Sequence, residues 1–416
     1  MHAFRRTIAI HVAAFTLASC GGGDTQDVET HIDTAGRLVI AQNGSTSIRV
    51  HDLDTQTLAG TFVLANPPSA LYASPGKRYA VAPQREQDLT QFVDGGIWQE
   101  DHVDHLHDYK ESPQLSSFRV SGVRPTHFEA HDDHAALFMD GVASSGTPAS
   151  VVLLSDAAIG KGAVDASVEL PMQMHGTGEP RGDYLLTTFR AADNVDTLPV
   201  QVELYRRSGS GYSLVTRFDE QCPSLHGSYS NEKHTVFGCS DGVLAVTQVG
   251  DTFTAKKIAN PAGLPTDLRV GTIAGHHERP TFIGIAGTGT LFDIDVEAGT
   301  MTEINWASGR TRRAHAFDRD GANFLVLDDL GTIHLLDATR NWAVRATLPA
   351  IATMPTASPF PTIAASGKEA KAFVTDPGGQ RIVVVDVGLA TLAAPIALGF
   401  APMAAVWVGV GEHAHE

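Results

Sequence analysis

The residues with the clearest chemical potential are histidines, of which the 416-residue chain has 19, roughly twice ordinary usage. His102, His105 and His107 alternate with aspartates, including Asp104, within residues 101–108. Neutral imidazole is the commonest metal ligand, and adjacent carboxylates orient imidazoles and concentrate cations. We therefore expect a metal-capture loop with these four residues as candidate ligands. A solvated polar loop is the alternative.

Five further histidines recur at wide intervals along the chain, each near the start of an apolar hairpin. They are His127, His175, His226, His276 and His315. Such regular placement suggests a shared structural position, so the elements that carry them decide what they can do.

Those elements are strands. From about residue 31 the chain shows no sustained helical periodicity, only short runs rich in β-branched and aromatic residues bounded by Gly, Asp, Asn and Pro. The runs form four-stranded units that repeat every 39 to 57 residues. This period is typical of a β-propeller. We predict an all-β fold, a single propeller of eight four-stranded blades, with seven blades as the alternative.

The eighth unit is split between the ends of the chain. A lone strand at 402–409 is expected to complete a blade begun by strands at 37–41, 47–52 and 60–65. Pairing of the N-terminal and C-terminal strands would close the ring and remove the exposed sheet edges.

In a propeller the first strand of each blade is innermost, so the five recurring histidines should converge on the central channel. We expect a subset from adjacent blades, His127, His175 and His226, to form a three-nitrogen metal site. Polar channel residues bonded to water are the alternative.

A second pair of histidines, His131 and His134, lies in the turn of one of these hairpins. By strand alternation this turn should open on the same face as the 101–108 segment, where the pair would complete a second, more exposed site. No role is assigned to the remaining histidines considered, which are His31, His51, His234, His277, His334, His413 and His415.

The N-terminus predicts export. Arg5 and Arg6 precede an apolar stretch that is about half the length of a membrane-spanning helix. The stretch ends in Leu17-Ala-Ser-Cys20, which resembles a bacterial lipobox. We expect a signal peptide at 1–20, a tether at 21–30, the propeller at 31–410 and a tail at 411–416. The resemblance implies lipidation of Cys20 and membrane anchoring; an ordinary signal peptide is the alternative.

The two other cysteines, Cys222 and Cys239, suit an exported protein because disulfides persist outside the cytoplasm. They flank a turn-like Ser230–Lys233 segment, so in a hairpin they would lie opposite each other. We expect a structural disulfide.

The 101–108 segment and the channel histidines together resemble the AztD-type periplasmic zinc metallochaperones. The motif reads His102-Val-Asp104-His105-Leu-His107, preceded by Phe92–Trp98, and the likeness extends over most of the mature chain. Two features depart from the family pattern: Tyr109 stands where a fourth alternate histidine often occurs, and a soluble carrier needs no lipobox. The resemblance implies Zn²⁺ as cargo, a periplasmic location and delivery to the solute-binding protein of a zinc ABC importer.

Other functions are less consistent with the sequence. The formal net charge is −17 and no basic block is present, so nucleic acid is not an expected partner. The chain has no Gly-x-Ser-x-Gly elbow, reactive cysteine or nucleotide-binding glycine motif. We expect a monomeric carrier that is not an enzyme. The alternatives are a metal-dependent propeller hydrolase or lyase and a surface-anchored interaction scaffold.

Overall fold

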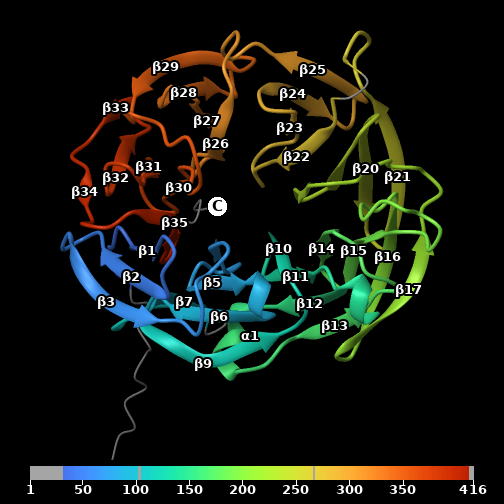
Figure 1. Ribbon diagram of the computed structural model, residues 1–416, viewed down its shortest axis with the longest axis horizontal. Coiled ribbons are helices and arrows are strands. Elements are labelled where there is room, and N and C mark those ends of the chain that lie inside the picture. The colour runs from blue at the N-terminus through green and yellow to red at the C-terminus, as the bar shows by residue number, and fades with distance from the viewer. Residues whose placement is uncertain (1–30, 102–104, 266–267, 412–416) are drawn as a thin grey trace, which may run out of the picture.

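The computed structural model describes residues 31–101, 105–265 and 268–411. The predicted signal peptide with Cys20, the tether, His102, Asp104 and most of the predicted tail lie outside these residues. Eight sheets are arranged around one central axis (Figure 1), which confirms the predicted eight-bladed propeller.

The strands of the first four blades follow the chain order, except that the first blade includes the last strand. The first blade consists of β1 (Arg37–Gln42), β2 (Ser47–Asp52), β3 (Thr57–Val63) and β35 (Pro402–Val408). The second consists of β4 (Tyr72–Ala73), β5 (Tyr79–Gln84), β6 (Leu89–Asp94) and β9 (Gln114–Ser121). The third consists of β10 (Pro125–His131), β11 (His134–Met139), β12 (Ser150–Leu154) and β13 (Ala166–Glu169). The fourth consists of β14 (Gly178–Arg181), β15 (Tyr184–Phe189), β16 (Gln201–Ser208) and β17 (Gly211–Arg217).

The remaining four blades repeat the same order from the inner to the outer strand. The fifth consists of β18 (Ser228–Ser230), β19 (His234–Cys239), β20 (Gly242–Val249) and β21 (Thr252–Ala259). The sixth consists of β22 (Val270–Ala274), β23 (Phe282–Ala286), β24 (Thr290–Asp295) and β25 (Thr300–Ile304). The seventh consists of β26 (Arg312–Phe317), β27 (Asn323–Asp328), β28 (Thr332–Asp337) and β29 (Ala343–Pro349). The eighth consists of β30 (Ile363–Ala365), β31 (Lys371–Asp376) and β32 (Arg381–Asp386), with an outer strand split into β33 (Thr391–Leu392) and β34 (Ile396–Ala397).

The core lies between the blades rather than inside one sheet. Both faces of each sheet pack on neighbouring blades, so the second strands are apolar without alternation; β27, for example, is buried along its whole length. The outer strands β3 and β29 are largely exposed and alternate instead. The described residues contain one α-helix, α1 (Asp156–Lys161), and two single 3₁₀ turns, η1 (Arg85–Gln87) and η2 (Ala143–Ser145). No helix among them is long and apolar enough to cross a membrane.

The ring is closed by β35, which pairs with β1 in antiparallel register from Arg37↔Val408 onward. Trp407 in β35 is 3% exposed, and its indole N–H donates to the carbonyl oxygen of Ala35 at 2.9 Å. Gly36 and Gly367 lie against its ring, where an added Cβ would come within 2.6 Å and 2.5 Å of ring atoms respectively. Trp407 therefore joins the first and last blades through contacts that only glycine permits.

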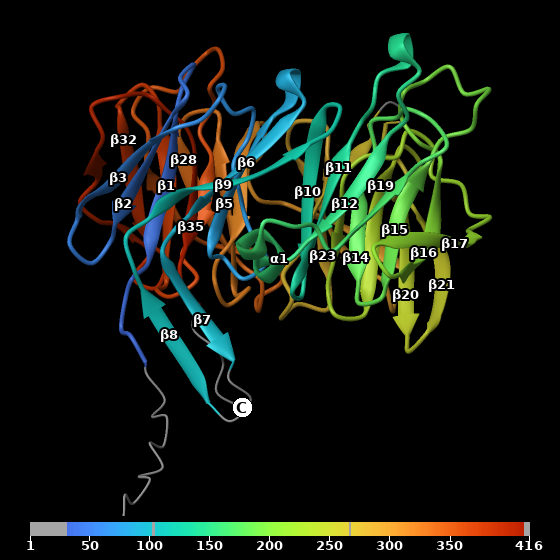
Figure 2. The ribbon, with the colours of Figure 1, turned by 90° about the horizontal axis from the view of Figure 1, so that it is seen from below.

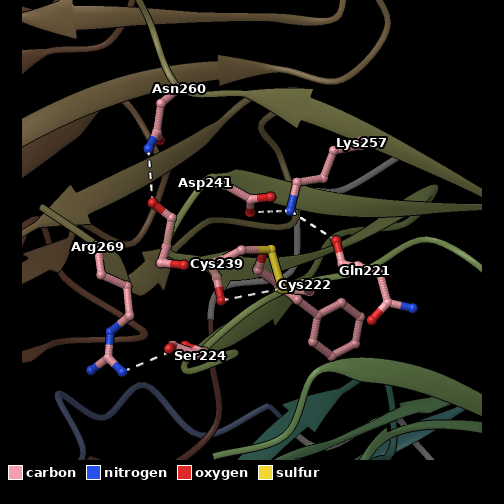
Figure 3. The surroundings of a disulfide bond; sticks show 11 residues. Gln221, Cys222, Ser224, Cys239, Asp241, Lys257, Asn260 and Arg269 are labelled. Atoms are coloured by element: carbon pink, nitrogen blue, oxygen red, sulfur yellow. Dashed lines mark hydrogen bonds and ion pairs between the residues drawn. A yellow bond between two sulfur atoms is a disulfide. The ribbon is translucent and has the colours of Figure 1, made fainter. Parts of the chain in front are cut away.

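A disulfide joins Cys222 to Cys239, with a Cα–Cα distance of 5.0 Å. Both cysteines are fully buried and belong to the core cluster between the fourth and fifth blades. Figure 3 shows this region, in which Lys257 donates to the carbonyl oxygen of Gln221 at 2.9 Å. The bond therefore fixes the connection between two blades and has no exposed sulfur for chemistry.

Replacing both Cys222 and Cys239 by alanine is expected to lower the free energy of unfolding by about 3 kcal/mol, the value for a closed loop of similar length. The sequence separation is 17 residues, and the unfolded chain gains freedom when the loop opens. Urea unfolding with and without a reductant measures the effect. Reductant should destabilise the parent to the level of the variant and leave the variant unchanged; equal stability of the oxidised parent and the variant would contradict the expectation.

The described residues of the 101–108 segment belong largely to two paired strands, whereas a loop was expected. Residues between β6 and β9 form β7 (Ile97–Asp101) and β8 (Leu106–Lys110), a separate two-stranded sheet that we call the insert hairpin. Trp98 stacks on Tyr109 across the two strands, with ring centroids 4.8 Å apart, and the Arg78 guanidinium lies 3.7 Å from the Trp98 ring centroid. Cross-strand aromatic pairing of this kind stabilises a hairpin. Figure 2 shows the insert hairpin projecting from one face of the propeller.

Candidate metal centre

Three histidines from consecutive blades converge at the inner edge of the propeller. His127 lies in β10, His175 three residues before β14, and His226 two residues before β18. The Nε2 atoms of His127 and His175 are 3.4 Å apart, and those of His175 and His226 are 3.1 Å apart. We call these residues the histidine triad.

Two nitrogen–nitrogen distances within the triad, those from His175 to its two neighbours, match tetrahedral zinc coordination. Two nitrogens bound to one zinc ion at tetrahedral angles are about 3.3 Å apart, given Zn–N distances of roughly 2.0 to 2.1 Å. Among the described residues, the triad is the one group of three or more His, Cys, Asp or Glu side chains close enough to share an ion. Three nitrogen donors leave a fourth position for water or a ligand from a partner.

The other ring nitrogens of two triad members are fixed by hydrogen bonds. His226 places Nδ1 2.7 Å from the carbonyl oxygen of Gly271, and His175 places Nδ1 3.0 Å from a carboxylate oxygen of Asp140. Both partners are acceptors, so each Nδ1 carries the proton and each Nε2 keeps its lone pair. The two lone pairs are therefore available to a metal ion.

The protonation state of the triad also suits a metal. Burial, followed by the nearby rings of His175 and His226, lowers the pKa of His127 to about 4. Burial likewise lowers the pKa of His226. Neutral imidazole is the form that binds metal, so no proton has to leave these two rings at neutral pH.

Asp140 and Arg85 support the triad from behind. Asp140 is 5% exposed and accepts from the Arg85 guanidinium at 2.9 Å, while Arg85 also donates to the Thr126 hydroxyl at 3.1 Å. Burial by itself would raise the pKa of Asp140, but the hydrogen bonds from His175 and Arg85 outweigh it and hold the pKa below the ordinary value. Asp140 is thus a carboxylate that orients His175.

Replacing Asp140 by asparagine is expected to weaken zinc binding by about 10- to 100-fold, the usual cost of losing a carboxylate behind a metal-binding histidine. The amide keeps the size of the side chain but removes the charge that selects the Nδ1–H form of His175. Competition with a chelating dye measures the affinity. Asp328→Asn is the matched control, because Asp328 is also a buried carboxylate beside a histidine, 3.0 Å from Nε2 of His334, but lies on the seventh blade. An equal loss in both variants would contradict the assignment.

The triad has room beside it for a hydrated ion. A cavity of about 660 Å³ is lined by His226 together with Ser224, Arg269, Gly271 and Thr272. Of the triad, His226 alone lines this cavity. Arg85 of η1 contacts the Asp140 carboxylate, so η1 lies on the same side of the propeller as the triad.

His276 and His315 do not join the triad. His276 follows β22 instead of opening it, lies stacked on His277 at 4.3 Å, and its Nε2 is 2.9 Å from the carbonyl oxygen of Arg319. His315 is the fourth residue of β26, and burial followed by the charge of Arg312 lowers its pKa to about 3. His276 lies beyond the end of its inner strand, and Ala314, one residue before His315, takes the register position in β26 that His127 takes in β10. The expected common position therefore applies to three blades only.

The insert hairpin lies on the opposite face from the triad. Arg85 and the rest of η1 immediately precede β6, whereas β7 follows β6 almost directly. A six-residue strand spans about 20 Å, so these two features are separated by the height of the blade (Figure 2). Nδ1 of His107 is 3.0 Å from the Tyr109 hydroxyl, and the rings of His105 and His107 are 6.3 Å apart.

His131 and His134 are on the insert face. They lie opposite each other at the β10–β11 turn, and Asp133 between them lines the same cavity of about 1030 Å³ as Trp98, Glu100 and Asp101 of the insert hairpin. Nε2 of His131 is 3.0 Å from the Arg181 guanidinium, and burial followed by the charge of Arg181 lowers the pKa of His131 to about 4. The described residues place no third ligand group beside this pair.

Known proteins are similar to this chain in sequence and in fold. No family model matches the chain. The zinc chaperone AztD of Citrobacter koseri is 26% identical over 390 residues, which cover 92% of this chain and 88% of that protein. The crystal structure of Citrobacter koseri AztD matches with a TM-score of 0.78 at 22% identity, over 91% of this chain and 99% of that chain.

A more distant match is the dihydro-heme d1 dehydrogenase NirN, with a TM-score of 0.57 at 12% identity over 92% of this chain and 77% of that chain. At this identity the likeness concerns the propeller fold alone. The predicted resemblance to AztD is therefore confirmed along nearly the whole described propeller, by sequence and by fold.

Proposed function

We propose that the protein is a zinc metallochaperone, a carrier that binds Zn²⁺ as cargo and hands it to another protein. The observation that carries this proposal is the convergence of three imidazole Nε2 atoms at 3.1 and 3.4 Å, the spacing that a tetrahedral zinc ion requires. The similarity to the zinc chaperone AztD supports zinc over copper or nickel, which imidazole ligands alone would not select.

The two histidine-containing regions suggest two different roles in zinc binding. The triad is held by Asp140 and Gly271, so it can retain an ion in a fixed geometry. The insert hairpin, whose described residues include the candidate ligands His105 and His107, projects from the other face and can meet ions or a partner protein. The candidate ligands His102 and Asp104 lie outside the described residues. We assign capture and transfer to the insert hairpin and tight retention to the triad.

The proposed setting follows from the N-terminal sequence. A signal peptide ending at Cys20 implies export, and its lipobox-like end implies a lipid anchor. The disulfide between Cys222 and Cys239 suits an oxidising compartment such as the periplasm. The proposed partner is the zinc-binding solute-binding protein of an ABC importer, approached by a monomer. Cell fractionation tests the anchor, since Cys20→Ala should move the protein from the membrane to the soluble fraction.

Zinc titration of the chain from residue 21 tests the function, beside a variant with His102, His105 and His107 changed to alanine. The parent should bind zinc in a tight class and a weaker class, and the variant should lose weakly bound zinc while it keeps the tight class. The zinc-loaded parent should transfer its zinc to a metal-free solute-binding protein faster than it releases zinc to a chelator. Absence of micromolar zinc binding in the parent, or metal-dependent turnover of an ester or lactone, would contradict a carrier.

A further inference from the structure

The inner strands of the third, fourth and fifth blades form a polar wall that continues below the triad. In β10 alternate side chains face the same side, so Glu129 and His131 follow His127 along one line. The corresponding residues of β14 are Glu179 and Arg181. This wall runs from the triad toward the face that carries the insert hairpin.

Contacts between blades occur at each level of this wall. Directly below the triad, the hydroxyls of Thr177 and Ser228 are 3.0 Å apart. At the next level Ser230 donates to a carboxylate oxygen of Glu179 at 2.8 Å. At the lowest level the Arg181 guanidinium is 3.0 Å from His131. Side chains of the three inner strands therefore contact one another across the blade boundaries.

Glu129 and Glu179 are adjacent carboxyls in this wall with few counter-charges. Glu179 is 1% exposed, and its second carboxylate oxygen, Oε1, has no hydrogen-bond partner within the described residues. Burial raises the pKa of Glu179 to about 7. Glu129 lies at the same level of the neighbouring strand β10, since each glutamate is two residues before the last paired residue of its inner strand and the two strands are in contact. An unpaired buried carboxylate oxygen is costly, and a bound cation would remove that cost at Oε1 of Glu179.

Arg181 does not supply that charge through a direct hydrogen bond. Its guanidinium donates to the backbone carbonyls of Asn231 and Glu232 and to the side-chain oxygen of Gln248 at 2.8 Å. Arg181 lowers the pKa of Glu179 only as the last of several causes, after burial and hydrogen bonds from Ser228 and Ser230. The orphaned Oε1 of Glu179 thus remains free to meet a cation.

We propose that Glu129 and Glu179, with the Ser230 hydroxyl, form a second divalent-cation site in the wall between the triad and the insert face. Carboxylate oxygens bind zinc, although three imidazoles arranged for tetrahedral coordination hold it more tightly. Glu129 is two residues from His127, roughly 6.6 Å along an extended strand. An ion could therefore pass between the faces by way of this carboxylate site, an extension that rests on the proposed carrier function.

The test uses Zn²⁺ alone and the full mature chain, with the insert histidines His102, His105 and His107 already changed to alanine. Four proteins are titrated: this background, the background with Glu129→Gln and Glu179→Gln, the background with His175→Ala, and all changes combined. We expect the background to bind two zinc equivalents. After the glutamine changes one tight equivalent should remain, whereas after His175→Ala the one remaining equivalent should bind at least tenfold more weakly than the tight one. The combination should bind none.

The outcomes separate this site from the triad. If the glutamine changes leave both equivalents, or if His175→Ala removes both, the carboxylate site is wrong. If His175→Ala removes neither while the glutamine changes remove one, the triad assignment fails and the carboxylate site stands. Glu203→Gln is the matched control, because Glu203 is a buried glutamate of the same blade that is paired with Arg217 at 2.8 Å, and it should leave the stoichiometry unchanged.

Folding of the variants is checked independently. Glutamine nearly matches glutamate in shape and removes a buried charge, so the melting temperature of the metal-free protein should not fall. Should the double change unfold the chain, Glu129→Gln and Glu179→Gln are titrated singly. Loss of the weaker equivalent in either folded single variant supports the site, and its retention in both overturns it.

Discussion

His175→Ala is expected to abolish tight zinc binding, with a loss of affinity of more than about 100-fold. His175 is the central member of the triad, since its Nε2 lies within 3.4 Å of His127 and 3.1 Å of His226. Removing a residue behind a metal ligand already costs 10- to 100-fold, and removing the ligand itself should cost more. The alanine also leaves Asp140 without its imidazole partner.

Competition of the mature protein with a zinc-binding dye at neutral pH measures this loss. His277→Ala is a suitable control, because the His277 side chain is 63% exposed and lies away from the triad beside His276. Circular dichroism and the melting temperature of the metal-free proteins separate lost coordination from lost folding. A folded His175→Ala protein with the affinity of the parent would eliminate the triad as the tight site.

Trp407→Ala is expected to lower the free energy of unfolding by about 3 to 5 kcal/mol, the usual cost of truncating a buried tryptophan. Trp407 packs in a core cluster with residues of the first and eighth blades, among them Leu38 and Phe373. The truncation leaves a cavity where the ring closes, and it removes the hydrogen bond to Ala35. Both losses act on the contact that keeps the ends of the ring together.

Urea unfolding followed by circular dichroism measures the effect. Trp98→Ala is the matched control, since it makes the same truncation in the insert hairpin, outside the ring. Trp98→Ala should leave the unfolding midpoint of the propeller nearly unchanged while it loosens the hairpin. If the two variants were equally stable, the closure at β35 would not be a main determinant of stability.

The fold could be predicted from the sequence because the blades of a propeller repeat one sequence pattern. Runs of buried residues bounded by turns recur in every blade, and the split blade was visible as one unpaired strand at 402–409 beside three strands near residue 37. The structure places these strands at Pro402–Val408 and from Arg37 onward. A period of this kind survives errors of a few residues in any single strand.

The candidate site depends on strand register, so an error of a few residues in a single strand misplaces its side chains. His127, His175 and His226 meet although they occupy slightly different positions relative to their strands. His276 was aligned with them but follows its strand, and this shift moves a side chain to the other end of the blade. Hydrophobic patterning alone does not locate the start of a short inner strand this closely.

The supporting residues had no signal in the sequence. Asp140 follows β11 and reads as an ordinary turn aspartate, while Arg85 lies one blade earlier. Their pairing behind His175 arises only when adjacent blades pack together. The insert hairpin was expected as a loop because its acidic and histidine residues suggest solvent, whereas the Trp98–Tyr109 pair holds it as two strands.

The pairing of β35 with β1 also bears on the order of events during synthesis. The hydrogen bond from Trp407 to Ala35 joins residues 372 positions apart, so the first blade stays one strand short until β35 has been synthesised. Contacts between such distant residues form slowly and late in folding. This delay leaves the ring open, with the inner edge of β1 unpaired, until its last strand is available.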